Sequence, residues 1–190
     1  GGGEKRWGVL PRGGGGGGNL LIQGDLIGAR RIQEEAVKLA REAARVNGLE
    51  LLAQEAADLR TAVRAYQGII NSPNLAHEAL WLLQDSTTVD ESVILPLVLE
   101  DGWGKNLLVF SSNMAHVKRG ALFSLYPSNV DLGRTLGASA MSYLGGGNTV
   151  RGVLPLTDVL MAVNLRTATH LGISLNYTQQ RAFDSVYPQP

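Results

Sequence analysis

The stretch ALWLLQDSTTVDESVILPLVLEDGWGKNLLVFSSN, residues 79–113, decides the fold. Its two apolar runs, 79–83 and 107–110, are short and apolar at consecutive positions, which is typical of parallel strands buried on both faces. Between them, Thr88 and Glu91 have the spacing of a helix capping box. Composition would also allow a strand over 93–99, where Pro96 is unfavourable inside a helix, but the cap favours a kinked helix. The stretch predicts a strand–helix–strand unit.

The same alternation continues on both sides of this stretch. Further strands are expected over 5–10, 49–53, 120–126 and 159–163, and further helices over 29–47, 59–70, 130–144, 164–171 and 178–186. Strands that alternate with helices of this length predict an α/β fold, a doubly wound parallel sheet with right-handed crossovers.

The bulk composition excludes several classes of function. Lys+Arg and Asp+Glu both number 17, so the basic excess of a typical nucleic-acid-binding protein is missing. The chain has no cysteine, which excludes disulfides, thiolate catalysis and cysteine-based zinc sites. No apolar run reaches the roughly 20 residues that span a bilayer. The first residues, GGGEKR, have no apolar core, so we expect no signal peptide in this sequence.

Six glycines at 13–18 follow the first predicted strand. A phosphate-binding loop would end in Gly-Lys-Ser/Thr, whereas Gly18 is followed by Asn19 and Leu20. The dinucleotide-binding fingerprint also fails, because no acidic residue lies at the required distance. We therefore interpret the tract as a linker or insertion, and we expect no nucleotide or other cofactor.

Polar side chains follow two successive predicted strands. Asp85, Ser86 and Thr87 come after the run at 79–83, and Ser112 and Asn113 come after the run at 107–110. Ligands of doubly wound sheets bind beyond the carboxyl ends of the strands. A carboxylate suits an ammonium group, and hydroxyls and helix N–H groups suit a carboxylate, so these residues predict a site for a small zwitterion. The alternative is that they only cap helices.

Catalysis has little support in the sequence. His116 lies close to Ser112, and such a pair could form a nucleophile, but no G-x-S-x-G elbow surrounds any serine. His77 and His170 are expected at the surface, and no histidine pair has metal-ligand spacing. We predict neither an enzyme nor a metal site. Trp7, Trp81 and Trp103 are expected to belong to the core.

The segments ALWLLQDSTTVDES, LLVFSSNMAHVKRGALFSLYPSNVDLGR and VNLRTATHLGI resemble the substrate-binding proteins of bacterial ABC transporters, in the TrpX-like branch of the periplasmic binding proteins. The resemblance covers roughly residues 30–187. It implies a type I periplasmic-binding-protein-like lobe over 1–125, and a segment over 126–190 that crosses back toward a first lobe that is missing here.

The resemblance also implies a function. It implies capture of a small polar metabolite such as an amino acid, a membrane permease as partner, and a periplasmic or membrane-anchored extracytoplasmic location. The turns at 84–88 and 111–113 would line the cleft, which again selects Asp85, Ser86, Thr87, Ser112 and Asn113. A sensory or regulatory ligand-binding domain of the same fold is the alternative, and self-association of the chain stays open.

Overall fold

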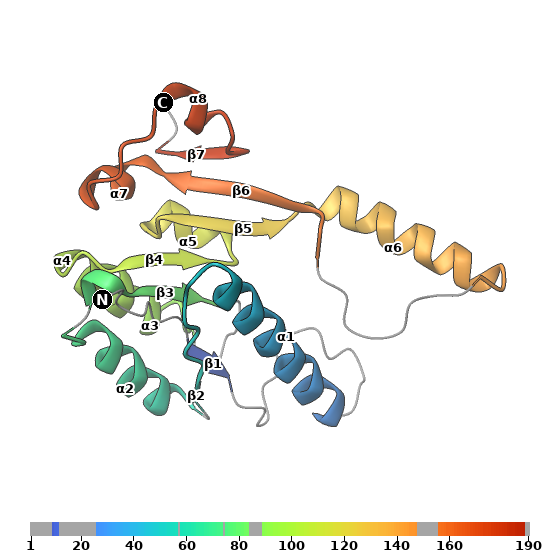
Figure 1. The fold of residues 1–190 in the computed structure, drawn as a ribbon, viewed down its shortest axis with the longest axis horizontal. Coiled ribbons are helices and arrows are strands. Elements are labelled where there is room, and N and C mark those ends of the chain that lie inside the picture. Colours follow the sequence, from blue (N-terminus) through green and yellow to red (C-terminus); the bar gives the residue numbers. More distant parts are fainter. Residues whose placement is uncertain are drawn as a thin grey trace.

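The computed structural model describes residues 9–11, 26–56, 58–73, 75–83, 89–147 and 156–188. Within them the chain forms a five-stranded, mostly parallel sheet and a two-stranded parallel sheet, with helices flanking them (Figure 1). The strands are β1 (Val9–Pro11), β2 (Gln54–Ala56), β3 (Ala79–Leu82), β4 (Leu108–Ser111), β5 (Phe123–Pro127), β6 (Val159–Asn164) and β7 (Ser185–Tyr187). The helices are α1 (Leu26–Val46), α2 (Leu59–Ile70), η1 (Leu75–His77), α3 (Ile94–Pro96), η2 (Leu97–Asp101), α4 (Gly102–Gly104), α5 (Met114–Arg119), α6 (Asn129–Leu144), α7 (Leu165–His170) and α8 (Tyr177–Gln180).

The described strands form two sheets. β3, β4, β5, β6 and β7 are hydrogen-bonded in that order, and β1 pairs with β2 and also contacts β3. β1–β2, β3–β4, β4–β5 and β6–β7 are parallel pairs. The predicted α/β class is therefore confirmed.

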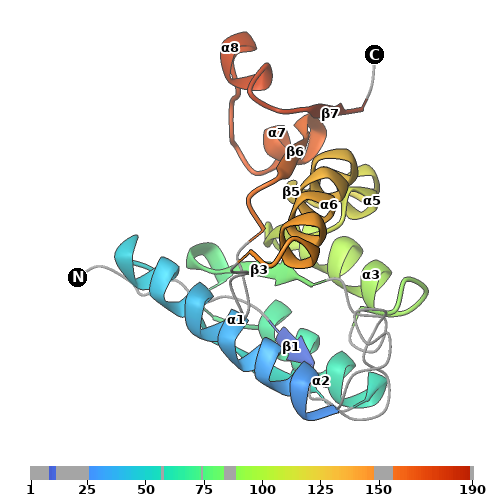
Figure 2. The same ribbon diagram turned by 90° about the vertical axis from the view of Figure 1, so that its right-hand side faces the viewer.

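The core lies between the sheet and the helices α2, α3 and α5. Leu80 and Leu82 of β3 and Val109 of β4 are at most 4% exposed, and they pack with Tyr66 and Ile94. Alternate residues of each strand share one face of a sheet, so this side chain pattern fixes which face the helices cover. Figure 2 shows α3 and α5 beside β3 and β5, while α1 runs near β1.

The segment between β3 and β4 is helical, as predicted, and Asp90 bonds the free N–H groups before α3. Thr88 lies outside the described residues, and Asp90 accepts hydrogen bonds from the backbone N–H groups of Ser92 and Val93, both at 2.8 Å. Pro96 is tolerated because α3 begins at Ile94, which places the proline in the first turn, where a backbone N–H has no helical partner. A π-helical turn, η2, follows directly.

Three predictions about single elements are wrong. The second strand is β2 at Gln54–Ala56, beyond the predicted 49–53. β6 runs antiparallel to β5, with Phe123 opposite Val163, so the sheet is not wholly parallel. The predicted helix over 178–186 ends at Gln180, and residues 185–187 pair with β6 instead. Asp184 draws this segment to the sheet, because its carboxylate accepts from the Met161 N–H at 2.7 Å and its own N–H donates to the Met161 carbonyl.

Candidate functional site

The turn after β4 holds two of the predicted binding residues, Ser112 and Asn113. Both side chains are half-buried. Asn113 has an extended backbone, and its Oδ1 accepts from the Ala115 N–H at 2.9 Å, so it is the N-cap of α5. The capping role considered for such residues thus applies to the Asn113 oxygen. It leaves the Nδ2 amide without a partner among the described residues.

The turn stands on a buried hydrogen-bond network that the sequence did not reveal. Ser111 Oγ donates to the Leu82 carbonyl oxygen at 3.2 Å, accepts from the Asn113 N–H at 3.0 Å and lies 2.7 Å from His116 Nδ1. The Ser111 hydroxyl and His116 Nδ1 share one short hydrogen bond, in which the tautomer of the ring sets the donor. The network ties the end of β3 to the turn and to α5.

His116 therefore pairs with Ser111, not with Ser112 as its sequence position suggested. Successive strand residues point to opposite faces, and only Ser111 points toward α5. The pair has the distance of a nucleophile and its base, yet Ser111 is 2% and His116 is 3% exposed. We assign it to support of the turn. Burial lowers the pKa of His116, with Arg119 adding to that effect and Glu91 opposing it, which favours the neutral ring.

Ser112 points to the other face and meets Trp81. The indole Nε1 donates to Ser112 Oγ at 3.0 Å, while the Ser112 N–H donates to the Leu82 carbonyl. Trp81, Phe110 and Phe123 stack along this face with ring centroids 5.8 and 5.0 Å apart. All three side chains are half-buried. Trp81 therefore belongs to this aromatic stack and also contacts the turn through Ser112.

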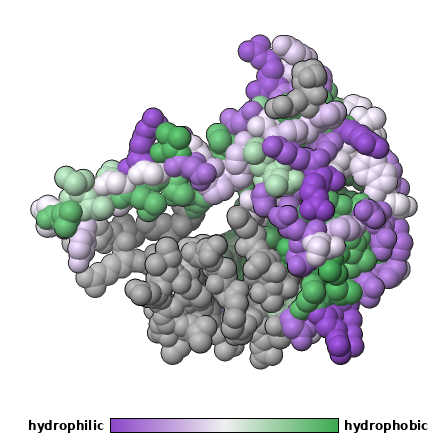
Figure 3. All heavy atoms as spheres, turned by 180° about the vertical axis from the view of Figure 1, so that it is seen from behind, coloured by the Kyte–Doolittle hydropathy of each residue, from purple (hydrophilic) through white to green (hydrophobic). Residues whose placement is uncertain are grey.

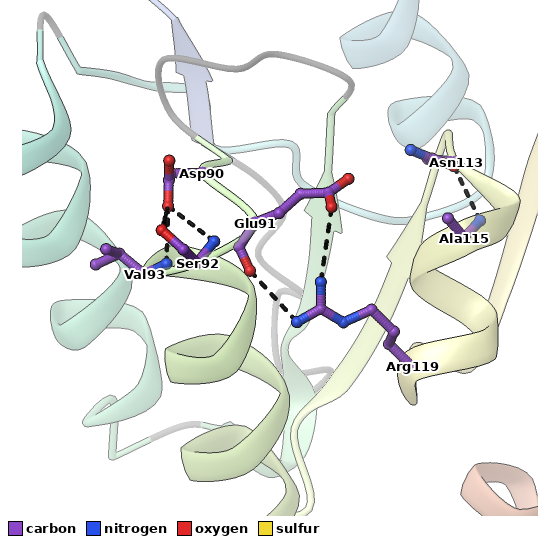
Figure 4. Close-up of polar contacts among 7 residues, drawn as sticks. All are labelled: Asp90, Glu91, Ser92, Val93, Asn113, Ala115 and Arg119. Carbon is purple, nitrogen blue, oxygen red and sulfur yellow. Dashed lines mark hydrogen bonds and ion pairs between the residues drawn. The ribbon is translucent and has the colours of Figure 1, made fainter.

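A second set of contacts joins the start of α3 to α5. Figure 4 shows Arg119 beside Glu91 and Asn113 at the start of α5. The Arg119 guanidinium lies 3.8 Å from the Glu91 carboxylate and donates to the Glu91 carbonyl oxygen at 3.3 Å. Hydrogen bonds from Ser92 and Val93 hold the pKa of Asp90 below its usual range, so this carboxylate stays charged as a cap.

The other predicted binding residues, Asp85, Ser86 and Thr87, lie outside the described residues. What the structure does place is the strand that leads to them. Leu82 is paired with Ser111, so β3 ends beside the turn of Ser112 and Asn113. The two strand ends of the predicted site are thus neighbours.

The remaining predicted positions fall elsewhere. His77 and His170 are exposed, as predicted. The His170 ring stacks on the half-buried Trp103 ring, with the two ring centroids 3.8 Å apart. The six glycines at 13–18 and Trp7 are outside the described residues. Within the described ranges no three His, Asp or Glu side chains gather as metal ligands, and no helix is long and apolar enough to cross a bilayer.

A hollow of about 400 Å³ lies away from the predicted site. It opens between α2 and the segments that lead into β2 and β3, at the amino end of β3. Polar groups of Arg64, Ser72 and Glu78 line it together with apolar Leu52 and Ile69. Ser72 Oγ donates to the Glu78 carboxylate at 2.9 Å, so its polar lining is partly satisfied within the chain.

Solved structures share this fold. A conserved domain protein of Vibrio cholerae matches 96% of the chain with a TM-score of 0.62 and 18% identity. An ABC domain from Streptococcus pneumoniae in complex with L-Trp matches 96% with a TM-score of 0.62 and 17% identity. A ligand-free, open substrate-binding protein with adhesive properties from Clostridium difficile matches 98% with a TM-score of 0.57 and 17% identity.

The match covers 54% of the Vibrio cholerae chain and 55% of each of the other two. The chain therefore spans about half the length of these structures. No family model matches it, and no curated protein matches it in sequence. At this identity the likeness establishes the fold, a periplasmic-binding-protein-like α/β architecture.

Proposed function

We propose that this chain binds a small polar metabolite, such as an amino acid, at the carboxyl ends of β3 and β4, and that it is the solute-binding component of an ABC importer. The observation that carries the proposal is the turn of Ser112 and Asn113, which stands beside the end of β3 on a buried scaffold. The Asn113 amide and the Ser112 hydroxyl proton are donors suited to a carboxylate. Asp85 would meet the ammonium group, with Ser86 and Thr87 beside it.

The fixed position of the turn supports binding. Ser111, His116 and Trp81 hold it from both faces of the sheet. A ligand group that meets a turn already held in place costs less ordering entropy than one that must order a free loop. Shared fold with a substrate-binding protein and with a domain in complex with L-Trp agrees with this role.

The wider assignments follow from the same proposal. Residues 1–125 would be the ligand-binding lobe, and residues 126–190 would cross toward a first lobe. The partner would be a membrane permease, the location would be periplasmic or membrane-anchored extracytoplasmic, and the chain would release its ligand chemically unchanged.

A thermal-shift screen with the proteinogenic amino acids tests the proposal. At a ligand concentration about 100 times Kd, binding adds about 2.7 kcal/mol to stability, so the melting temperature should rise with one of them. Asn113→Asp keeps an oxygen to cap α5 and removes the amide donors, so this variant and Asp85→Ala should lose the shift.

Arg64→Ala is the matched control, because Arg64 lines the hollow at the amino end of β3. It should retain the ligand-induced shift. The proposal fails if no amino acid stabilises the chain, or if Arg64→Ala removes the shift while Asn113→Asp keeps it.

A further inference from the structure

The hollow at the amino end of β3 contains a buried carboxylate without a counter-ion. Glu78 is 9% exposed, and its Oε1 accepts from Ser72 Oγ at 2.9 Å, while its Oε2 has no hydrogen-bond partner among the described residues. Within the same part of the chain, no Lys, Arg or His lies within 4.0 Å of this carboxylate. Buried carboxylates are normally paired with a cation, because burial removes the water that stabilises their charge. Glu78 therefore indicates a missing cationic partner.

The last turn of α2 adds negative potential to the same hollow. Gly68, Ile69 and the C-cap residue Asn71 line the hollow together with Glu78. The carbonyl groups at a helix C-terminus form the negative end of its dipole, where a cation is favourable. The last turn of α2 has no basic residue of its own. Lys105 donates to Asn71 Oδ1 at 2.6 Å but does not belong to the lining, so the hollow itself keeps its negative character.

The rest of the hollow has the size and the walls of a small-molecule site. Its volume of about 400 Å³ lies within the roughly 300–1,000 Å³ of such sites. Leu52, Ala65 and Ile69 give it apolar walls. A Cβ built on Gly68 would meet nothing within 4 Å, so this glycine leaves the hollow open. Glycine is unfavourable inside a helix, and no packing within the chain requires it here.

A buried carboxylate, a helix C-terminus and apolar walls together suit an ammonium group on a short alkyl chain. A primary ammonium has three N–H donors, and Gln54, which also lines the hollow, has an amide oxygen to add to the Glu78 carboxylate. A metal ion fits less well, since no three His, Asp or Glu side chains gather in the described part of the chain. Arg64 also lines the hollow and repels a second positive charge, which favours a monoamine over a diamine.

We infer that this hollow is a binding site for a small primary monoamine, whose ammonium group pairs with Glu78 while its alkyl chain lies against Leu52 and Ile69. The site is at the opposite end of β3 from the turn of Ser112 and Asn113. It is therefore separate from the site proposed above for a polar metabolite, and the inference does not depend on that function.

An NMR titration of the isotope-labelled chain with n-butylammonium chloride tests the site. Sodium chloride and 1-butanol are the matched probes for ionic strength and for the alkyl chain. The backbone amides around Gly68 and Glu78 should shift to saturation with the amine alone. Glu78→Gln keeps an acceptor for Ser72 but removes the charge, so it should weaken amine binding by about tenfold or more. Glu100→Gln, which removes an exposed carboxylate elsewhere, is the control and should bind the amine as the parent does.

Two further variants test the geometry of the hollow. Gly68→Leu favours the helix but fills the hollow, so it should abolish amine binding while circular dichroism shows that the helix is kept. Arg64→Ala removes a competing cation and should strengthen amine binding severalfold. Shifts that do not saturate, that 1-butanol or sodium chloride reproduces, or that survive Glu78→Gln or Gly68→Leu overturn the inference. Weaker amine binding by Arg64→Ala would also overturn it.

Discussion

Two serines that face each other across β4 and β5 have opposite consequences for stability. Ser111 and Ser124 are register partners, and both are buried. Ser111 makes hydrogen bonds with three groups, whereas Ser124 Oγ has no partner within the described residues. A buried hydroxyl without a hydrogen bond destabilises the folded state. Removing a hydroxyl that is hydrogen-bonded also destabilises it, because the partner groups are left without a hydrogen bond.

We expect Ser124→Ala to raise the free energy of unfolding by about 1 kcal/mol, since it removes an unsatisfied group. Ser111→Ala should lower it by about 2 kcal/mol, because Leu82, Asn113 and His116 lose their common partner. Urea denaturation of the two variants beside the parent chain measures both. Equal destabilisation by both changes would contradict this reading of the pair.

His116 predicts a particular dependence of stability on pH. Burial lowers its pKa from the ordinary 6.5, so the unfolded chain takes up a proton before the folded one does. The stability that the neutral His116 ring contributes is therefore fully present above the unfolded pKa. It is lost as the pH drops below about 6.5 toward the folded pKa. The facing charges are Glu91, which opposes the shift, and Arg119, which adds to it.

The measurement is the free energy of unfolding between pH 7.5 and pH 5, compared with that of His116→Gln, whose side chain does not titrate. We expect the parent to lose stability on acidification and the variant to change less. Asp58, Asp90 and Asp131, whose hydrogen bonds lower their pKa values, act only at lower pH, below the usual carboxylate value. If the free energy of unfolding of His116→Gln fell with pH as steeply as that of the parent, His116 would not be the cause of the pH dependence.

At the scale of single elements, local patterns predicted the helices with their own caps. The helix predicted over 59–70 is α2, and the one predicted to begin at Asn164 is α7. In both, a polar side chain bonds the first free N–H groups, a signal readable from a few neighbouring residues. β7 could not be predicted in this way, because its pairing depends on Asp184 meeting Met161 across the fold.

Asn164 connects one such element to the rest of the fold. Its Oδ1 accepts from the Thr167 N–H at 3.1 Å, and its Nδ2 donates to the Val117 carbonyl at 2.8 Å. Asn164→Ala should cost about 2 to 3 kcal/mol, since it removes a cap and leaves the carbonyl unsatisfied. Asn176→Ala, at the exposed cap of α8, should cost about 1 kcal/mol or less. Thermal melts that rank the two in reverse would contradict this.

At the scale of the molecule, stability is unevenly distributed. β3 and β4 contribute buried side chains to the core, whereas α6 has no buried side chain and shows hydrophobic residues along its surface (Figure 3). An isolated helix of this length is marginal in water. In hydrogen exchange, we expect the amides of 129–144 to exchange far faster than those of 79–82 and 108–111 at low protein concentration. Protection of the 129–144 amides equal to that of the strand amides would contradict this expectation.

The overall architecture was predictable because it follows from alternation of short apolar runs with amphipathic segments. The adjacency of the two strand ends followed from the same pattern, and the pairing of Leu82 with Ser111 confirms it. The supporting residues were harder to predict. Side chains alternate between the two faces along β4, so only one of Ser111 and Ser112 can point toward His116. The sequence does not show which face α5 covers, and it therefore leaves both choices open.

The hydrogen bond between Trp81 and Ser112 gives the molecule an intrinsic optical reporter. Indole emission shifts with the polarity and hydrogen bonding around the ring nitrogen, and here that nitrogen is bonded to the turn itself. With Trp7 and Trp103 replaced by phenylalanine, the remaining fluorescence would come from one position. A structural change at the turn would then shift the emission wavelength of Trp81, which can be followed in real time without an added label.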